Sequence, residues 1–235
     1  MEKEIYRNRF TDEELRQQKA FWAPICRYLE SHMPVKGATL DLGAGFCHFI
    51  NNVRSTERYA VDINEENLLR HASPEVRVIT SSGHRLSRIP DSSLDNVFAS
   101  NVYEHFQTRE DVLESFHEVY RVLREGGRFI ILQPNFAYCA RQYFDFFDHR
   151  LAFTHRSMSE GLESASFKLI RVVDRFLPFT SKSRLPKATW LVELYLKIPL
   201  AWRVFGVQML IVAEKTGRDD NHRGRAISPA DSTGR

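Results

Sequence analysis

Two glycines and a more distant aspartate form the most informative polar pattern in this sequence of 235 residues. Gly43 and Gly45 directly follow the run Thr39–Leu42, and a glycine at the end of a strand lets the backbone approach a ligand that a side chain would block. Asp62 ends the next apolar run, Tyr59–Val61, at a position from which a carboxylate can bind both hydroxyls of a ribose. The pattern therefore predicts a site for a nucleotide-like ligand.

The elements that position these residues follow from an alternation of short apolar runs with amphipathic segments. The expected strands are 38–42, 59–61, 76–80, 96–100 and 128–132, and the expected helices are 46–53, 64–72 and 109–123. This alternation predicts an α/β fold with a parallel sheet and helices on both of its faces. Further expected elements are a helix from about 157, a strand over 167–176, a helix over 187–197 and a last strand over 204–214. Gly126 and Gly127 are expected to form the left-handed cap that ends the helix over 109–123.

Composition restricts the class of protein. Thirty-three Lys and Arg residues against 30 Asp and Glu residues leave a formal charge of +3, so nucleic acid is not an expected partner. Three scattered cysteines and the lack of a secretory signal or a membrane span favour the cytoplasm. We expect one domain over 1–215, with a helical cap (1–36), a helical insert before the last strand (177–203) and a disordered tail (216–235) that is poor in large apolar residues.

Two further features help to distinguish between classes of nucleotide ligand. A dinucleotide fingerprint has a third small residue where this chain has His48, which argues against NAD. The run Asp95–Phe106 leads from a strand into polar and aromatic groups, and we expect ligand contacts from Asn101 to Glu104. An NAD(P)-dependent oxidoreductase stays open as an alternative at this point.

With these motifs in order, the sequence resembles the class I S-adenosylmethionine-dependent methyltransferases, in particular their small-molecule, type-11-like group. The matching segments are LDLGAG (40–45), AVD (60–62), IPDSSLDNV (89–97), SNVYEH (100–105), RVLREGGR (121–128) and ILQPN (131–135). More loosely, 147–149, 175–178 and 206–209 resemble relatives from sugar and cell-surface polysaccharide genes. The resemblance implies a Rossmann-like sheet of seven strands, mostly parallel, with the last strand antiparallel.

The resemblance also implies S-adenosylmethionine as the cofactor and assigns its contacts to matching positions only. They are Asp41, Gly43 and Gly45 along the methionine moiety, Asp62 at the ribose and Asn101 beside the sulfonium. Cys47 replaces the third glycine of the family, a change that could narrow the pocket. The family's usual acid at the adenine amino group is also missing, so Ser82 or His84 is the expected substitute.

An enzyme of this kind would methylate a small-molecule or glycan-like acceptor, with oxygen favoured over carbon as the attacked atom. A hydroxyl acceptor needs a base as its proton leaves, and histidine is the usual base near neutral pH. His149 and His105 are the candidate catalytic residues, and His155 is a weaker one. The alternatives are a packing or helix-capping role for His105 and a loop hydrogen bond for His149. No His, Cys and Asp residues have the sequence spacing of zinc ligands, so no metal is predicted.

The segment 171–203 carries seven basic residues against two acidic ones, a net charge of +5, interleaved with aromatic and leucine residues. This composition suits peripheral contact with anionic lipid or with a lipid-linked glycan acceptor. The alternative is that its helix covers the sheet or forms a dimer interface. A catalytically inactive methyltransferase-like scaffold at the membrane surface is a further hypothesis.

Overall fold

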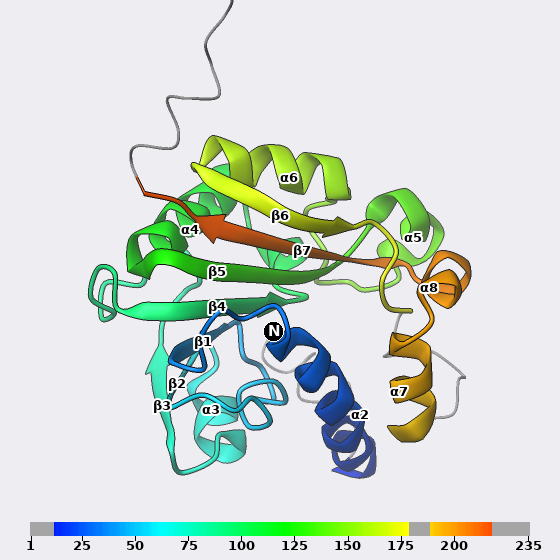
Figure 1. Cartoon of the computed structure of the whole chain (residues 1–235), viewed down its shortest axis with the longest axis horizontal. Coiled ribbons are helices and arrows are strands. Elements are labelled where there is room, and N and C mark those ends of the chain that lie inside the picture. Colours follow the sequence, from blue (N-terminus) through cyan, green and yellow to red (C-terminus); the bar gives the residue numbers. More distant parts are fainter. Residues whose placement is uncertain (1–11, 179–188, 218–235) are drawn as a thin grey trace, which may run out of the picture.

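The computed structural model describes residues 12–178 and 189–217 and shows one sheet between two layers of helices (Figure 1). The strands are β1 (Ala38–Leu42), β2 (Glu57–Asp62), β3 (Val76–Thr80), β4 (Leu94–Ser100), β5 (Leu123–Pro134), β6 (Phe167–Val173) and β7 (Gln208–Lys215). The helices are α2 (Asp12–Glu30), α3 (Glu65–His71), α4 (Arg109–Val122), α5 (Phe136–Tyr143), α6 (His155–Ser164), α7 (Thr189–Leu196) and α8 (Pro199–Phe205), and a single 3-10 turn, η1 (Tyr103–His105), follows β4.

The strand order in the sheet is β3-β2-β1-β4-β5-β7-β6. Strands β1 to β5 pair in parallel, whereas β7 is antiparallel to both β5 and β6. The expected Rossmann-like sheet with an antiparallel last strand is therefore confirmed. The strand order reverses between β1 and β4, and in open α/β sheets the carboxyl ends of the strands at such a point form a ligand-binding crevice.

The central strands divide their side chains between two buried clusters, one on each face of the sheet. In β5, Phe129 and Ile131 belong to the cluster that includes side chains of α4 and α6. Ile130 and Leu132 belong to the other cluster, which includes side chains of α2, α3, α7 and α8. Because both faces are buried, the strands read as continuous apolar runs in the sequence. They form a packed support for the residues at their carboxyl ends.

The segment 46–53 forms successive turns instead of the expected helix. Gly45 at φ +48° and Cys47 at φ +58° are left-handed, whereas an α-helix needs right-handed dihedral angles from its first turn. In addition, the side-chain amide of Asn52 donates to the carbonyl of His48 at 2.8 Å, and such local bonds compete with regular helix formation.

Two other predicted boundaries are also wrong. Gly126 has the predicted left-handed backbone, with φ +74°, but α4 already ends at Val122, so this glycine shapes a turn in the first part of β5 and does not cap the helix. The last strand begins only at Gln208 and not at residue 204, because the preceding residues form α8. A proline at the start of α8 favours its initiation.

The expected N-terminal cap and helical insert meet on one face of the sheet, where α2 and α7 lie side by side (Figure 1). Arg27 of α2 donates to the Glu193 carboxylate of α7 at 2.5 Å. Residues 179–188 of the insert and 218–235 of the expected tail lie outside the described residues. Within the described ranges, no helix has the length and apolar character needed to span a membrane.

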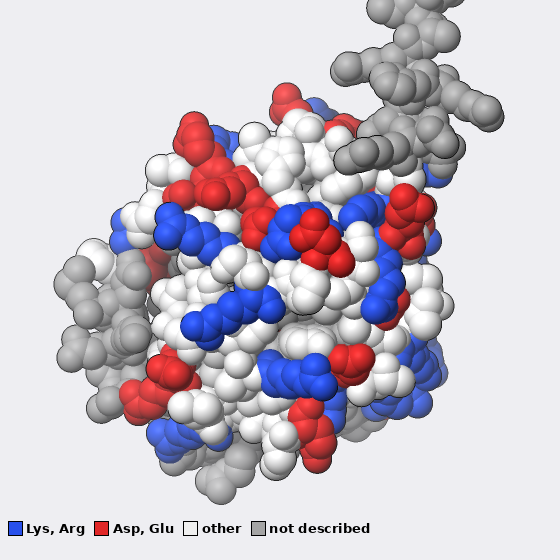
Figure 2. All heavy atoms as spheres, turned by 90° about the vertical axis from the view of Figure 1, so that its left-hand side faces the viewer, with Lys and Arg blue, Asp and Glu red and all other residues white. Residues whose placement is uncertain are grey.

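The edge opposite the carboxyl ends of the parallel strands carries charges of both signs. Its ion pairs include Arg121–Asp91, Arg124–Asp95 and Arg128–Glu214. Figure 2 views the molecule from this side and shows basic and acidic side chains interspersed. The face in that view therefore lacks the single-sign field that attracts a polyanion.

Candidate active site

The turn after β1 brings a closely packed backbone to the crevice between β1 and β4. Gly43 has φ +68°, and a Cβ atom there would lie only 2.5 Å from Cγ2 of Val102. Glycine accommodates both the left-handed backbone and this close approach. The N–H of Gly43 donates to the carbonyl of Val61 at 2.8 Å, which ties the turn to the end of β2.

Cys47, which stands where the methyltransferase family has its third glycine, has a left-handed backbone with φ +58°. A residue with a side chain pays about 1–2 kcal/mol for this conformation. The side chain is fully buried in the apolar cluster beneath the sheet face, with Sγ 3.9 Å from the carbonyl oxygen of Gly45. Burial also raises the pKa of its thiol to about 12. Cys47 thus fills the core and leaves the ligand side of the turn to Gly43 and Gly45.

Asp62 connects the glycine turn to the end of β2. Its Oδ2 accepts the N–H of Gly45 at 2.9 Å, and its Oδ1 accepts the N–H of Asn64 at 2.8 Å. Each carboxylate oxygen has a second lone pair, and the side chain is partly exposed. Asp62 can therefore accept hydrogen bonds from ribose hydroxyls while it holds the turn in place.

Asp41 has a very different environment, since it lies inside β1 and is only 3% exposed. Its Oδ2 accepts the N–H of Ile50 at 3.3 Å. Burial, with a smaller contribution from the Asp62 carboxylate, raises the pKa of Asp41 to about 8. A ligand ammonium group placed nearby favours the ionised carboxylate, so donor binding and the ionisation of Asp41 are expected to be coupled.

Asn101 stands at the end of β4, on the other side of the crevice, with φ +51°. Its N–H donates to the carbonyl of Leu132 at 3.0 Å, and its Oδ1 accepts Nε2–H of Gln208 at 3.2 Å. Asparagine is one of the few residues other than glycine that adopt this backbone readily. Two neighbouring strands thus hold Asn101 at the crevice, and nothing in the local sequence indicated its contact with Gln208.

These residues fit an adenosyl ligand at the crevice between β1 and β4. The turn at Gly43 and Gly45 allows close backbone approach, and the Asp62 carboxylate can accept hydroxyl donors. His84 lies farther along, after β3, and its ring packs edge-to-face on Phe106 with 5.9 Å between ring centroids. The adenine contact of His84 therefore stays a prediction.

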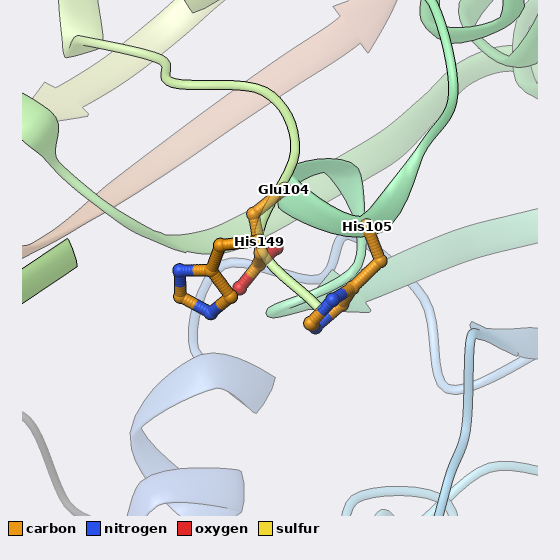
Figure 3. A group of neighbouring side chains, drawn as sticks. All are labelled: Glu104, His105 and His149. Carbon is orange, nitrogen blue, oxygen red and sulfur yellow. The ribbon is translucent and has the colours of Figure 1, made fainter. Parts of the chain in front are cut away.

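A second polar group lies one short turn after Asn101. Glu104, His105 and His149 each contribute one nitrogen or oxygen atom, and these three atoms lie within 4.8 Å of one another (Figure 3). The Glu104 side chain is 1% exposed, its Oε2 accepts Nε2–H of Gln133 at 2.6 Å, and burial raises its pKa. The two predicted catalytic histidines are thus brought together, with ring centroids 5.2 Å apart.

The loop before α6 folds back onto η1 and orients this cluster. The N–H of Arg150 donates to the carbonyl of Glu104 at 2.7 Å. Nδ1 of His105 lies 3.0 Å from the carbonyl oxygen of Asp148, and because a carbonyl only accepts, Nδ1 carries the proton of the neutral ring. Asp148 therefore orients His105.

The third histidine candidate lies apart from the cluster, at the start of α6. Nδ1 of His155 is 3.0 Å from Nδ2 of Asn135, and the ring lies parallel to that of Tyr138. Gln133 is the site residue that sequence reasoning missed. The signal that could have identified it is a glutamine inside an apolar strand, because a buried amide requires a polar partner.

Comparison with known proteins decides between the two ligand classes that the glycine turn leaves open. A family model described as a methyltransferase domain matches residues 40–131, from β1 to β5. This segment contains the glycine turn, Asp62, Asn101 and two members of the histidine cluster. No curated protein sequence matches the chain.

Several solved structures share the fold at low sequence identity. The methyltransferase solved with the Haloferax volcanii Trm112 activator is 15% identical, with a TM-score of 0.65, over 88% of this chain and 95% of that one. An S-adenosylmethionine-dependent methyltransferase from Archaeoglobus fulgidus is 20% identical, with a TM-score of 0.61, over 86% and 94% of the two chains. A geranyl diphosphate methyltransferase in complex with GPP and sinefungin is 16% identical, with a TM-score of 0.60, over 82% and 78%.

At these identities the structural likeness concerns the fold, whereas the family match concerns the donor-binding half of the sheet. The matched segment runs from β1 to β5 and so includes both strands that border the crevice. Residues 40–131 thus match the methyltransferase-domain family, in a fold shared with S-adenosylmethionine-dependent methyltransferases, and this match supports S-adenosylmethionine and not NAD as the cofactor.

Proposed function

We propose that this enzyme methylates a hydroxyl oxygen of a small-molecule or glycan-like acceptor. The observation that carries the proposal is the position of His105 and His149, one turn after Asn101 and next to the donor crevice. A hydroxyl must lose its proton as it attacks, and histidine is the side chain best suited to accept that proton near neutral pH.

When bound, S-adenosylmethionine supplies a methyl group that the sulfonium charge already activates. The protein must therefore position the acceptor, exclude water and remove one proton. Asp62 and the glycine turn hold the donor, and Asn101 contacts it near the reacting end. His149 is the proposed general base. His105 is the second candidate, because its Nδ1–H donates to the Asp148 carbonyl and the lone pair of Nε2 is left for an acceptor proton.

The surface near the site favours an amphiphilic acceptor, such as a lipid-linked glycan. In α7 and α8, buried residues such as Val192 and Trp202 cover the sheet, as one alternative predicted. The opposite side of these helices exposes Trp190, Leu194, Ile198, Leu200, Val204 and Phe205. Lys197 and Arg203 lie between these exposed apolar residues in sequence. Cations among apolar groups suit an anionic lipid surface, and this supports peripheral membrane contact through 171–203.

The helices that carry this surface lie at the same end of the molecule as the donor crevice (Figure 1). Phe144 and Phe147, which follow α5 at this end, are also exposed, at 59% and 79%. An acceptor held in a lipid surface would therefore meet the protein on the side where the histidine cluster lies.

Donor titration and methyl transfer test the proposal separately. The purified chain should bind S-adenosylmethionine and S-adenosylhomocysteine in calorimetry and should transfer labelled methyl groups to hydroxyl acceptors in a panel of sugars, glycolipids and phenols. His149→Ala should lower kcat by about 100-fold or more, the usual contribution of a general base, while donor affinity is unchanged. His155→Ala is the matched control and should keep both. Transfer to amines alone, or an unchanged kcat in His149→Ala, would contradict the proposal.

A further inference from the structure

The cluster beside the donor crevice has the composition of a metal site. Glu104 and His105 come from η1, and His149 comes from the loop before α6 (Figure 3). Their three donor atoms lie within 4.8 Å of one another, and bonds of about 2.1 Å around one ion require only small side-chain adjustments from such a separation. The long sequence interval between His105 and His149 is why ligand spacing along the chain did not indicate a metal.

Glu104 provides an independent sign that a group is bound there. Its Oε2 accepts the hydrogen bond from Gln133, whereas its Oε1 is buried and has no hydrogen-bond partner among the described residues. An unsatisfied buried carboxylate oxygen is costly, and native structures rarely leave one without a partner. A cation between Glu104 and the two histidines would satisfy this oxygen.

The outer contacts of the cluster also match those of metal-binding histidines. Such ligands usually donate their second ring N–H to a carbonyl or a carboxylate, which fixes the tautomer. His105 does so to the carbonyl of Asp148, and its Nε2 is thereby left as the ligand atom. The His149 ring stacks on Phe146 with 4.9 Å between centroids and meets the edge of Tyr143 at 4.8 Å, contacts that limit its rotation.

We propose that Glu104, His105 and His149 bind one divalent transition-metal ion of the Zn²⁺, Fe²⁺ or Co²⁺ class. Two imidazoles and one carboxylate suit these ions, whereas Mg²⁺ and Ca²⁺ prefer all-oxygen sites. Three protein ligands leave coordination positions open, as in catalytic sites. Both histidines are partly exposed, so an acceptor can reach the ion.

This inference rests on the proposed hydroxyl acceptor, and it replaces the base role proposed above for His149 with that of a metal ligand. The ion would bind the acceptor oxygen and lower the pKa of its hydroxyl, so that the proton passes to solvent water. The oxygen lone pair then forms the new bond to the methyl carbon while the carbon–sulfur bond breaks and its electron pair stays on sulfur. In this reaction His149 acts as a ligand and not as the base.

Cobalt binding to the full-length, chelator-treated protein tests the site without any acceptor. Co²⁺ should bind with a stoichiometry of one per chain at this site and give visible d–d absorption, and Zn²⁺ should displace it. Glu104→Gln and His149→Ala should each weaken Co²⁺ binding by about 10-fold or more, because the loss of even an outer contact at a metal site commonly lowers metal affinity by this amount. His155→Ala, a histidine outside the cluster, should bind Co²⁺ like the wild type.

Among the described residues, one other group could compete for cobalt, formed by His84, Asp111 and Glu114, of which Glu114 is exposed. If His84→Ala removes the cobalt spectrum and His149→Ala does not, the proposal is wrong. A wild-type protein with no visible cobalt spectrum also overturns it, whatever the folding of the variants. Thermal unfolding curves identify variants that keep the fold.

The metal inference and the proposed O-methylation can fail independently. Hydroxyl methylation at an unchanged rate after removal of the ion would refute the metal's role and leave the O-methyltransferase proposal in place. A cobalt spectrum that depends on Glu104 and His149, in a protein that methylates only amines, would establish the ion and refute the hydroxyl acceptor.

Discussion

Replacing Gly43 with alanine tests whether the glycine turn is shaped by steric contact as well as by backbone conformation. The new Cβ would lie 2.5 and 2.9 Å from the two methyl carbons of Val102, a β-branched side chain with little rotational freedom. The left-handed backbone at φ +68° adds about 1–2 kcal/mol for any residue with a Cβ, and overpacking adds about 1–3 kcal/mol. We therefore expect Gly43→Ala to lower the free energy of unfolding by about 2–5 kcal/mol.

Gly126 provides a matched control, because it has a similar left-handed backbone, φ +74°, and a Cβ there would meet nothing within 4 Å. Gly126→Ala should cost only the conformational part, about 1–2 kcal/mol, and should leave donor binding unchanged. The double variant Gly43→Ala/Val102→Ala should recover much of the steric part, with a coupling energy of about 1–3 kcal/mol.

Urea unfolding with comparable m-values measures these free energies, and calorimetry measures the affinity for S-adenosylmethionine. Gly43→Ala should weaken donor binding by about 10-fold or more, since a shift of only 1.4 kcal/mol in binding free energy has that effect. Equal losses of stability for the Gly43 and Gly126 variants, within about 0.5 kcal/mol, would refute the steric argument. So would zero coupling between Gly43 and Val102.

Three further predictions concern other parts of the site and the surface. Asp62→Ala removes the acceptor of two backbone N–H groups and the proposed ribose contact, so it should abolish measurable donor binding in calorimetry and lower the unfolding free energy by about 1–3 kcal/mol. The pKa of Asp41 in the folded protein is raised to about 8, so folding favours the protonated form of this side chain. The donor-free protein should therefore lose stability as pH rises from about 4 to 8. Asp41→Asn should flatten this part of the plot of melting temperature against pH. The double variant Leu200→Ser/Phe205→Ser should lower the affinity for anionic vesicles, measured by co-sedimentation, by about 10-fold, because less apolar surface is buried in the membrane. Leu69→Ser removes an exposed leucine of α3 and should leave this affinity unchanged.

Sequence patterns predicted the strands beside the crevice because the signals of these strands are local. Each of the first four strands contains a short run of apolar residues, and Asp62 and Asn101 stand at the ends of β2 and β4. The segment after Gly45 was predicted incorrectly, since amphipathic spacing cannot show that Cys47 adopts a left-handed backbone. The predicted role of Gly126 as a helix cap was also wrong. Its left-handed conformation is a local property, whereas its inclusion in β5 depends on pairing with β4.

The sequence by itself determined the sheet class, the glycine turn and the candidate residues Asp62, His105 and His149, because residue type and spacing along one strand and its following turn carry that information. Only the tertiary structure decided that Glu104, His105 and His149 share one cluster. Their proximity depends on how the loop before α6 folds back onto η1, through backbone hydrogen bonds from Arg150 to Glu104. The charge state of Asp41 likewise depends on burial, which distant elements create by covering the strand, and no local pattern records that desolvation.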